Sequence, residues 1–312
     1  MAKISSTFLQ RALTLRHMRL LLAVEELRQV GRVATALSIS QPAVSKALAE
    51  IEKGIGVTLF DRTPLGMLPT AHGSCLLRYA HMMTNEITRA VDELTGIEQG
   101  VAAAVAVGAT FGSGTGYLLA AATLQCRQRV PELAVTVTEG TRELLLRQLR
   151  TGRLDIVIGT VGEPAAPADL QSTPLYIDAP TIVCVTRHPL AAKRKPGWGD
   201  LLAQPWVLPP RTTRVRDAIE ALFRRAGSER PRVLAETLSL DLNLELLAQG
   251  NALGLLPQHL ARRLATAGQM RVLEVETPGL VMPISLFTLP AARASMAVDT
   301  LRTCLVQAAA LR

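Results

Sequence analysis

The chain has 312 residues, of which 48% are hydrophobic, 19% charged and 3% aromatic, and its formal net charge is +8. This length predicts two or three domains, and the composition excludes intrinsic disorder. No apolar run reaches the roughly 18 residues of a membrane span, and the first residues lack the apolar segment of a signal peptide. We therefore expect a cytoplasmic protein with no membrane partner, whose positive charge suits a polyanion.

The four cysteines, Cys75, Cys126, Cys184 and Cys304, stand singly, with no Cys-x-x-Cys pair and no histidine-rich neighbour. Such spacing favours reduced structural thiols over a disulfide framework or a zinc site. We expect neither a metal nor a cofactor. A redox pair stays open only if the fold brings two of these thiols together.

Short helical patterns separated by turns extend from Leu15 to Gly73. The first predicted helix begins after an extension of about fourteen residues and reaches Val24. Its apolar face, at three- and four-residue steps, would consist of Leu15, Met18, Leu21 and Leu22. A second helix is expected over about Val30 to Leu37.

The third predicted helix covers about Gln41 to Lys53, after a turn in which Ser40 can cap it. Its buried side would hold Val44, Ala47 or Leu48, and Ile51. Two such helices can cross as a helix-turn-helix, in which the N-terminal residues of the second helix meet the base edges of the major groove. The alternative is a surface helix of an all-α domain whose exposed polar residues have no role.

The amino end of this third helix carries residue types that suit DNA. Gln41 can make a bidentate contact to adenine, and Pro42 or Ala43 can pack on a thymine methyl group. Ser45 can bond to a base or a phosphate, and Lys46 can reach a phosphate or a guanine. The helix N-terminus itself favours a phosphate.

The following segment, "VTLFDRTPLGMLPTAHG", predicts a strand, a tight turn at Pro64–Gly66 and a returning strand. This two-stranded wing would place Arg62 at the sugar–phosphate backbone or the minor groove. Together with the preceding helices it favours the helix-turn-helix over the surface-helix alternative.

A long helical pattern then runs from Ser74 to about Gln99, and Gly96 and Gly100 would mark its end. One side is apolar and carries Leu76, Leu77, Met83, Ile87, Val91 and Leu94. We expect this stripe to pair with a second subunit, which would set two recognition helices about 34 Å, or a multiple of it, apart on one DNA face. The alternative is a helix that lies on its own domain.

After Gly100 the chain alternates strands and helices, beginning with the βαβαβ pattern from "AAAVAVGAT" to "LDIVIGT". This pattern predicts a parallel sheet with right-handed crossovers. The segment "EPAAPADL" interrupts it, and the alternation resumes as far as the closing helix "SMAVDTLRTCLVQAAAL". We expect two half-sized α/β lobes that hold a ligand beyond the carboxyl ends of their strands.

The run "SISQPAVSKALAEIEKGIGVTLFDR" closely resembles the N-terminal domain of LysR-type transcriptional regulators. The resemblance implies an α+β multidomain fold: a winged helix-turn-helix over residues 1–73, a linker and dimerisation helix over 74–100, and a two-lobed α/β effector domain over 101–312 that resembles periplasmic binding proteins. Lobe I would cover about 101–163 and 276–312, and lobe II about 164–275.

The resemblance also implies partners and contacts. The partners would be double-stranded DNA with an interrupted palindromic promoter site, a small-molecule inducer, further copies in a homodimer or homotetramer, and RNA polymerase. Base reading would fall to Gln41, Pro42, Ala43, Ser45 and Lys46, and backbone contacts to Arg62, Thr35 and Thr70. The wing departs from the family pattern at Pro64 and Pro69, where basic and aliphatic residues are frequent.

Two regions are candidates for the inducer site. In the family the loop after the first strand of the effector domain borders the cleft, which implicates Thr110, Phe111, Gly112 and Ser113. The glycine spacing of this loop does not match a dinucleotide fingerprint. The facing candidates in the other lobe are Thr212, Thr213, Arg214, Leu238, Ser239, and Asn251 to Gly254. Hydroxyl groups at helix starts beside Arg211, Arg214 and Arg216 favour an anionic inducer, for instance a carboxylate, although the arginines could simply be solvated.

No catalytic set is evident in the sequence. The five histidines, His17, His72, His81, His188 and His259, are scattered, and G-x-S-x-G, H-E-x-x-H and P-loop motifs are absent. We therefore expect no enzyme. The remaining alternative is a solute-binding protein without DNA function, which the winged domain opposes.

Overall fold

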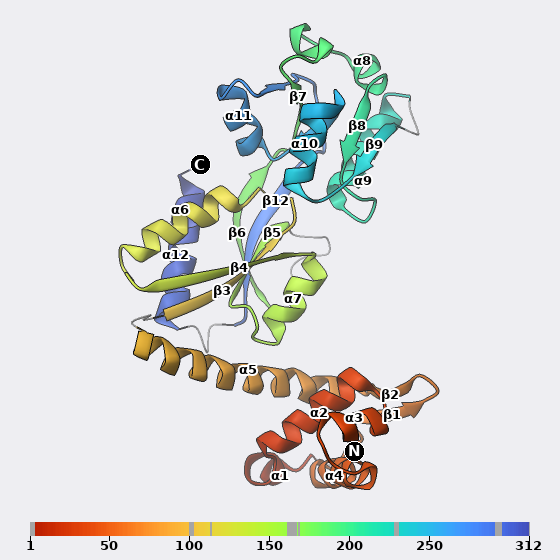
Figure 1. Ribbon diagram of the computed structural model, residues 1–312, viewed down its shortest axis with the longest axis vertical. Helices are drawn as coiled ribbons and strands as arrows, with labels where there is room; N and C mark the ends of the chain where they lie inside the picture. Colours follow the sequence, from red (N-terminus) through yellow and green to blue (C-terminus); the bar gives the residue numbers. More distant parts are fainter. Residues whose placement is uncertain are drawn as a thin grey trace. The chain divides into compact units, whose positions relative to one another are not determined.

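The protein is described by a computed structural model that covers residues 4–99, 103–112, 114–160, 167, 169–227, 231–290 and 295–311 (Figure 1). Its contacts divide the chain into two compact units. The N-terminal unit comprises Met1–Ala102 with Arg147–Leu154, and the C-terminal unit comprises Ala103–Leu146 with Asp155–Arg312. Among the described residues, no helix is long and apolar enough to cross a membrane.

The N-terminal unit contains five helices and a hairpin within its described residues. They are α1 (Ser6–Arg11), α2 (Leu15–Leu27), α3 (Val30–Ala36), α4 (Gln41–Ile55), β1 (Phe60–Thr63), β2 (Gly66–Pro69) and α5 (Ala71–Gln99). Their shared core includes Val24, Val33, Ile51 and Leu59, each at most 1% exposed. The three predicted helices therefore pack around one apolar centre.

The buried face of α2 differs from the prediction. Leu15 is 51% exposed and Leu22 is half-buried, whereas Leu20 and Val24 are buried beside Met18 and Leu21. Helix α2 packs against α3 and α4 and also against α5 and β2. Because it is covered from several sides, its apolar face is wider and rotated relative to the single stripe inferred from the sequence.

The short extension predicted before Leu15 contains a packed helix, α1. The Ser5 N–H donates to the Ile55 carbonyl at 3.0 Å, where α4 ends. The Phe8 ring lies against Gly54, whose missing side chain makes room for it, since a Cβ there would lie 2.3 Å from the ring. Helix α1 thus closes the core next to the carboxyl end of α4.

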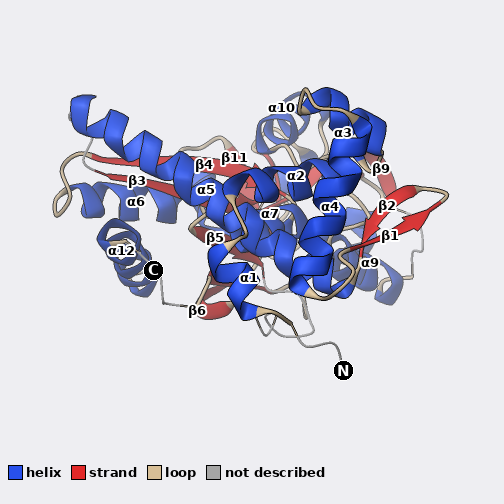
Figure 2. Cartoon of the chain, turned by 90° about the horizontal axis from the view of Figure 1, so that it is seen from below, coloured by secondary structure: helices blue, strands red, loops and turns tan. Residues whose placement is uncertain are grey.

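The wing forms as predicted. Strands β1 and β2 pair antiparallel with Arg62 opposite Met67, and they extend beyond the helices as a hairpin (Figure 2). Gly66 takes a positive φ of 102° in the turn. The hairpin is fixed to the end of α2 by a hydrogen bond from the Met67 N–H to the Arg28 carbonyl, at 2.8 Å.

Helix α5 begins at Ala71, before the predicted start, and its first half belongs to the core of the N-terminal unit. Leu77 and Ala80 are at most 2% exposed, and His81 Nε2 lies 2.7 Å from Glu25 Oε2 of α2. Leu77 was predicted as a dimerisation residue, but it is buried because α5 packs on α2. Gly96 lies within the helix instead of ending it, and Gly100 lies outside the described residues.

Lobe I of the C-terminal unit is built on a five-stranded sheet in the order β4-β3-β5-β12-β6. Its elements are β3 (Ala103–Thr110), α6 (Gly116–Arg127), β4 (Leu133–Gly140), the first part of α7 (Arg142–Arg150), β5 (Ile156–Thr160), β6 (Gln171–Asp178), β12 (Met282–Thr288) and α12 (Met296–Ala310). The rest of α7, from Arg147, counts with the N-terminal unit. Strands β3, β4 and β5 are parallel as predicted, and β12 runs antiparallel between β5 and β6. Helices α6 and α12 lie side by side on this lobe (Figure 1).

The lobe boundary predicted at residue 164 is wrong for β6, since this strand pairs with β12 in the sheet of lobe I. The sequence "QSTPLYID" carries polar residues and a proline, so it lacks the apolar run of a buried strand. A proline is tolerated there because β6 is an edge strand.

Lobe II contains a second five-stranded sheet in the order β11-β7-β10-β8-β9. Its elements are β7 (Thr181–Val185), the 3₁₀ helix η1 (Pro189–Ala192), α8 (Trp198–Leu202), β8 (Pro205–Leu208), α9 (Arg214–Arg225), β9 (Arg232–Glu236), α10 (Leu240–Gly250), β10 (Leu253–Leu256), α11 (Gln258–Thr266) and β11 (Met270–Val272). Strands β8, β9 and β10 are parallel. The chain passes between the lobes twice, after β6 and before β12, as expected for a clamshell.

Candidate functional site

The amino end of α4 presents the predicted base-reading residues to solvent. Gln41, Pro42, Ala43 and Lys46 are exposed and Ser45 is half-buried. The opposite face is anchored in the core by Val44, Leu48 and Ile51, each at most 5% exposed. Ser40 caps the helix, its hydroxyl oxygen accepting the Ala43 N–H at 3.3 Å, which stabilises the amino end of α4.

Gln41 is held close to α3. A Cβ atom at Gly31 would lie 3.2 Å from Gln41 Nε2, so the absence of a side chain at Gly31 gives this amide its place. Lys46 makes a long ion pair of 4.0 Å with Glu50, and both side chains are mostly exposed. Such a pair contributes little to stability, and the ammonium group stays accessible to a phosphate.

The three predicted backbone contacts differ in their surroundings. Arg62 is exposed on β1. Thr35 is exposed on α3, where its hydroxyl donates to the Gly31 carbonyl at 3.2 Å. The Thr70 hydroxyl donates to the Thr58 carbonyl at 2.8 Å and accepts the Gly73 N–H at 3.0 Å. Thr70 therefore joins the wing to the first turn of α5, and its hydroxyl is already engaged.

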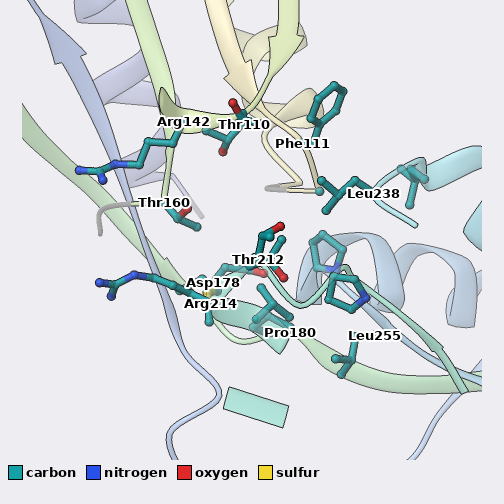
Figure 3. Close-up of a pocket in the computed structure, with 18 of the residues that line it drawn as sticks. Thr110, Phe111, Arg142, Thr160, Asp178, Pro180, Thr212, Arg214, Leu238 and Leu255 are labelled. Carbon is teal, nitrogen blue, oxygen red and sulfur yellow. The ribbon is translucent and has the colours of Figure 1, made fainter. Parts of the chain in front are cut away.

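A pocket of about 560 Å³ lies between the two lobes of the C-terminal unit (Figure 3). Lobe I contributes the ends of β3, β4, β5 and β6 and part of β12, and lobe II contributes the loops before α9 and α10 and the end of β10. This volume suits a small organic molecule. The strand ends meet at the pocket, as the fold class predicts.

Seven of the predicted effector residues line the pocket: Thr110, Phe111, Gly112, Thr212, Thr213, Arg214 and Leu238. Ser113 lies outside the described residues. Ser239, Asn251 and Gly254 are not among the lining residues.

These three positions have structural surroundings that explain their absence. The Ser239 hydroxyl oxygen accepts the Leu242 N–H at 3.3 Å and so caps α10. Asn251 ends α10 in a left-handed conformation with φ of 47°. It precedes β10, whereas the pocket lies at the carboxyl end of that strand, at Leu255 to Pro257. Gly254 gives room to Leu247, because a Cβ there would lie 2.9 Å from that side chain.

Several lining residues were not foreseen from the sequence, and they include Gly140, Thr141, Arg142, Glu143, Thr160, Asp178 and Asn243. The turn from Gly140 to Glu143 follows a strand and starts a helix, as does the loop after β3. The same rule applied to β4 would have identified this turn. Asp178 had no comparable signal, since β6 itself was not predicted.

The charges at the pocket are mixed. Arg142 and Arg214 come from opposite lobes, and their guanidinium groups lie on the same side of the pocket in Figure 3. Asp178 is 3% exposed, and its Oδ2 accepts the Gln258 N–H at 3.4 Å, at the start of α11. The starts of α7, α9 and α10 also border the pocket, and helix N-termini favour an anion.

Arg211 and Arg216 do not line the pocket. Arg216 is fully buried, with Nε 2.7 Å from Glu220 Oε1 and Nη1 2.8 Å from Glu236 Oε1. The Arg211 side chain is 72% exposed and lies 3.9 Å from Glu236. Of the three arginines considered from the sequence, Arg214 is the one at the pocket wall.

Two family models match the two units of the chain. "Bacterial regulatory helix-turn-helix protein, lysR family" matches residues 15–74, and "LysR substrate binding domain" matches residues 98–310. The chain therefore belongs to the LysR family of DNA-binding transcriptional regulators that carry an effector-binding domain. This confirms the family expected from the sequence and does not favour a solute-binding protein without DNA function.

Particular relatives fit this assignment. The HTH-type transcriptional regulator GbpR of Azospirillum brasilense is 29% identical over 297 residues, which cover 93% of this chain and 86% of that protein. GalR of Pseudomonas putida is 28% identical over 292 residues, with 94% and 73% covered.

Solved structures show the same fold. Full-length OxyR from Pseudomonas aeruginosa matches with a TM-score of 0.60 and 22% identity over 96% of each chain. Full-length CbnR in complex with its target DNA matches with a TM-score of 0.59 and 18% identity over 95% of this chain and all (100%) of that chain.

Proposed function

We propose that the chain binds an interrupted palindromic promoter site in double-stranded DNA and regulates transcription there in response to a small anionic inducer. The observation that supports DNA reading most directly is the exposed amino end of α4, with Gln41 and Lys46 in front of a buried apolar face. In this proposal Gln41, Pro42, Ala43, Ser45 and Lys46 meet base edges. Arg62, Thr35 and Thr70 contact the backbone.

DNA binding is tested by a shift assay with the chain's own upstream region over a range of salt concentrations. Because lysines and arginines that neutralise phosphates release counterions, affinity should fall steeply as salt rises. Lys46→Ala should weaken binding, whereas Lys53→Ala, an exposed lysine in the last turn of the same helix, should not. A flat salt response contradicts the proposal.

The inducer pocket is proposed to take an organic acid. Arg142 and Arg214 provide cations, and the starts of α7, α9 and α10 provide partial positive charge. Thr110, Phe111, Gly112, Thr212, Thr213 and Leu238 complete the proposed contacts.

Isothermal titration against a panel of organic acids tests this pocket. An acid that binds should lose about tenfold or more in affinity in Arg214→Gln, since a hydrogen bond to a charged group contributes roughly 1.5–3 kcal/mol. Arg224→Gln, an exposed arginine in the last turn of α9, serves as the control. Binding of neutral sugars alone, or a response to peroxide alone, contradicts an anionic inducer.

The proposed assembly is a homodimer that pairs through α5 and associates further to a homotetramer. We propose that it acts with RNA polymerase in the cytoplasm, where its DNA lies. The exposed residues Met83, Ile87, Val91 and Leu94 of α5 support the dimer, because a contiguous apolar surface marks an interaction site.

A further inference from the structure

We propose that Arg28 is a further DNA-binding residue, which holds a backbone phosphate between the recognition helix and the wing. The inference rests on the DNA binding proposed above and adds a contact that the sequence pattern did not indicate. Arg28 ends α2 in a left-handed backbone conformation, with φ of 56° and ψ of −3°.

This conformation is unfavourable for a residue that has a Cβ atom, and glycine or asparagine usually takes it at a helix end. Two contacts with the wing stabilise it. The Met67 N–H donates to the Arg28 carbonyl at 2.8 Å. Gly66 lies so close that a Cβ there would be 2.5 Å from the same carbonyl oxygen and 3.0 Å from Arg28 Cβ. The fold thus keeps an arginine where a glycine would be free of strain.

The position of Arg28 links the two surfaces proposed to meet DNA. On one side it touches Gly66 in the turn of the wing. On the other it stands three residues before Gly31, against which the Gln41 side chain lies. We expect a side chain at this junction to reach the sugar–phosphate backbone when α4 occupies the major groove.

The Arg28 side chain has no evident structural task. It is exposed, and the described residues make no hydrogen bond or ion pair with its guanidinium group. The nearby acid Glu25 is instead paired with His81, at 2.7 Å. A guanidinium group forms bidentate hydrogen bonds to phosphate. Backbone strain retained at a residue without an internal partner points to a function outside the chain.

Fluorescence anisotropy of the full-length protein tests the proposal with two labelled duplexes, the chain's own upstream region and an unrelated sequence of equal length. Arg28→Gly removes the cation and suits the backbone conformation. We expect about a three- to tenfold weaker affinity for both duplexes, because a phosphate contact carries no sequence information. The slope of log affinity against log salt should fall by about one, while the melting temperature stays equal or rises.

Two further variants make the outcome decisive. Arg28→Lys keeps the charge and should retain the wild-type salt slope. Arg16→Gln removes an exposed arginine at the opposite end of α2 and should leave affinity and slope unchanged. Wild-type affinity and slope in Arg28→Gly, or an equal loss in Arg16→Gln, overturns the proposal while DNA binding itself stands. If the wild-type protein binds neither duplex, the proposed function fails together with it.

Discussion

His188 is a buried imidazole in lobe II, at 2% exposure. Its Nδ1 accepts the Leu190 N–H at 3.1 Å and so begins η1. Burial lowers the pKa of His188 below its ordinary value of 6.5, and the Asn251 backbone opposes this shift only in part. The folded state therefore favours the neutral ring, and the unfolded chain binds a proton more readily.

Lobe II should consequently lose stability as the pH falls below about 6.5, by at most about 1.4 kcal/mol per pH unit from this group. The stabilisation that the neutral His188 ring provides is fully present above about pH 6.5. Urea unfolding followed by the fluorescence of Trp198 and Trp206, both in lobe II, measures it between pH 7.5 and 5.5. His188→Asn should reduce the pH dependence, and the exposed His72→Gln should not. Equal pH slopes in wild type and His188→Asn would contradict this assignment.

The cysteines divide into one exposed and three buried thiols, all free. Burial raises the pKa of Cys126, and the neighbouring Cys304 raises it further. Burial also raises the pKa of Cys184 to about 11. The fold does bring Cys126 and Cys304 together, from α6 and α12, but within the core of lobe I.

Since the thiolate is the reactive form, a thiol reagent such as DTNB should modify about one thiol per native chain, at Cys75. All four thiols should react after denaturation in urea. Cys75→Ser should abolish the native reaction. Rapid modification of two or more thiols in the native protein would contradict this expectation, since it would show that a buried thiol is accessible.

The residues of helix α5 serve two purposes. Its first half contributes Leu77 and Ala80 to the core of the N-terminal unit, and its second half leaves Ile87 at 38%, Val91 at 56% and Leu94 at 65% exposure. Cutting the chain at Gly73 would therefore damage that core as well as remove the proposed dimer contact. Substitutions in the second half test the contact alone.

Ile87→Glu combined with Val91→Glu should break the pairing through α5 and lower the mass of the assembly, because burying two carboxylates in an apolar interface costs several kcal/mol. Light scattering on the purified full-length chain measures the mass. Leu124→Glu, at a 67% exposed leucine of α6, is the matched control and should keep the wild-type mass. A wild-type mass in the double variant rules out pairing through this stripe.

The elements that the sequence predicted well share strong local signals. Helix α4 has a capping serine, an N-terminal proline and an apolar residue at each turn, and the wing has a proline–glycine turn between two short strands. Strands β6 and β8 escaped prediction; β6 has a proline and only one buried residue, Asp178, so it lacks the pattern of a core strand. For such strands, pairing with distant segments decides the structure more than local propensity does.

The same reasoning explains the candidate site. The family resemblance implicated Thr110, Phe111 and Gly112, and they line the pocket, where the carboxyl ends of parallel strands gather. Asn251 was misplaced because it precedes its strand. Asp178 and Asn243 line the pocket only because the two lobes meet there, and no local sequence pattern encodes that meeting.

At the scale of the whole C-terminal unit, the two lobes touch beside the pocket. The Tyr117 ring of α6 stacks on the His259 ring of α11, with centroids 4.0 Å apart. Gly114 fits against Pro257 at the start of α11, where a Cβ would lie 2.4 Å from the proline ring. Gly112 has the same φ of 66°, but a Cβ there meets nothing within 4 Å.

These two glycines allow the contact between lobes to be separated from backbone strain. Gly114→Ala and Gly112→Ala both place a side chain at the same positive φ, but only Gly114→Ala presses against Pro257. We expect the free energy of unfolding of Gly114→Ala to be about 1–3 kcal/mol lower than that of Gly112→Ala, which is the typical cost of overpacking. Urea unfolding by tryptophan fluorescence measures the difference. Equal free energies of unfolding for the two variants would mean that the lobes can move apart at Gly114 and Pro257 without a cost in stability.

The antiparallel strand β12 stands between β5 and β6, and α12 covers the same sheet beside α6. During synthesis the N-terminal unit's helices and wing leave the ribosome long before β12 does, and domains fold as units in that order. The sheet of lobe I lacks the strand that joins β5 to β6 until β12 has been made. A newly made chain should therefore acquire its DNA-reading surface first and its ability to respond to an inducer only after β12 and α12 have been made.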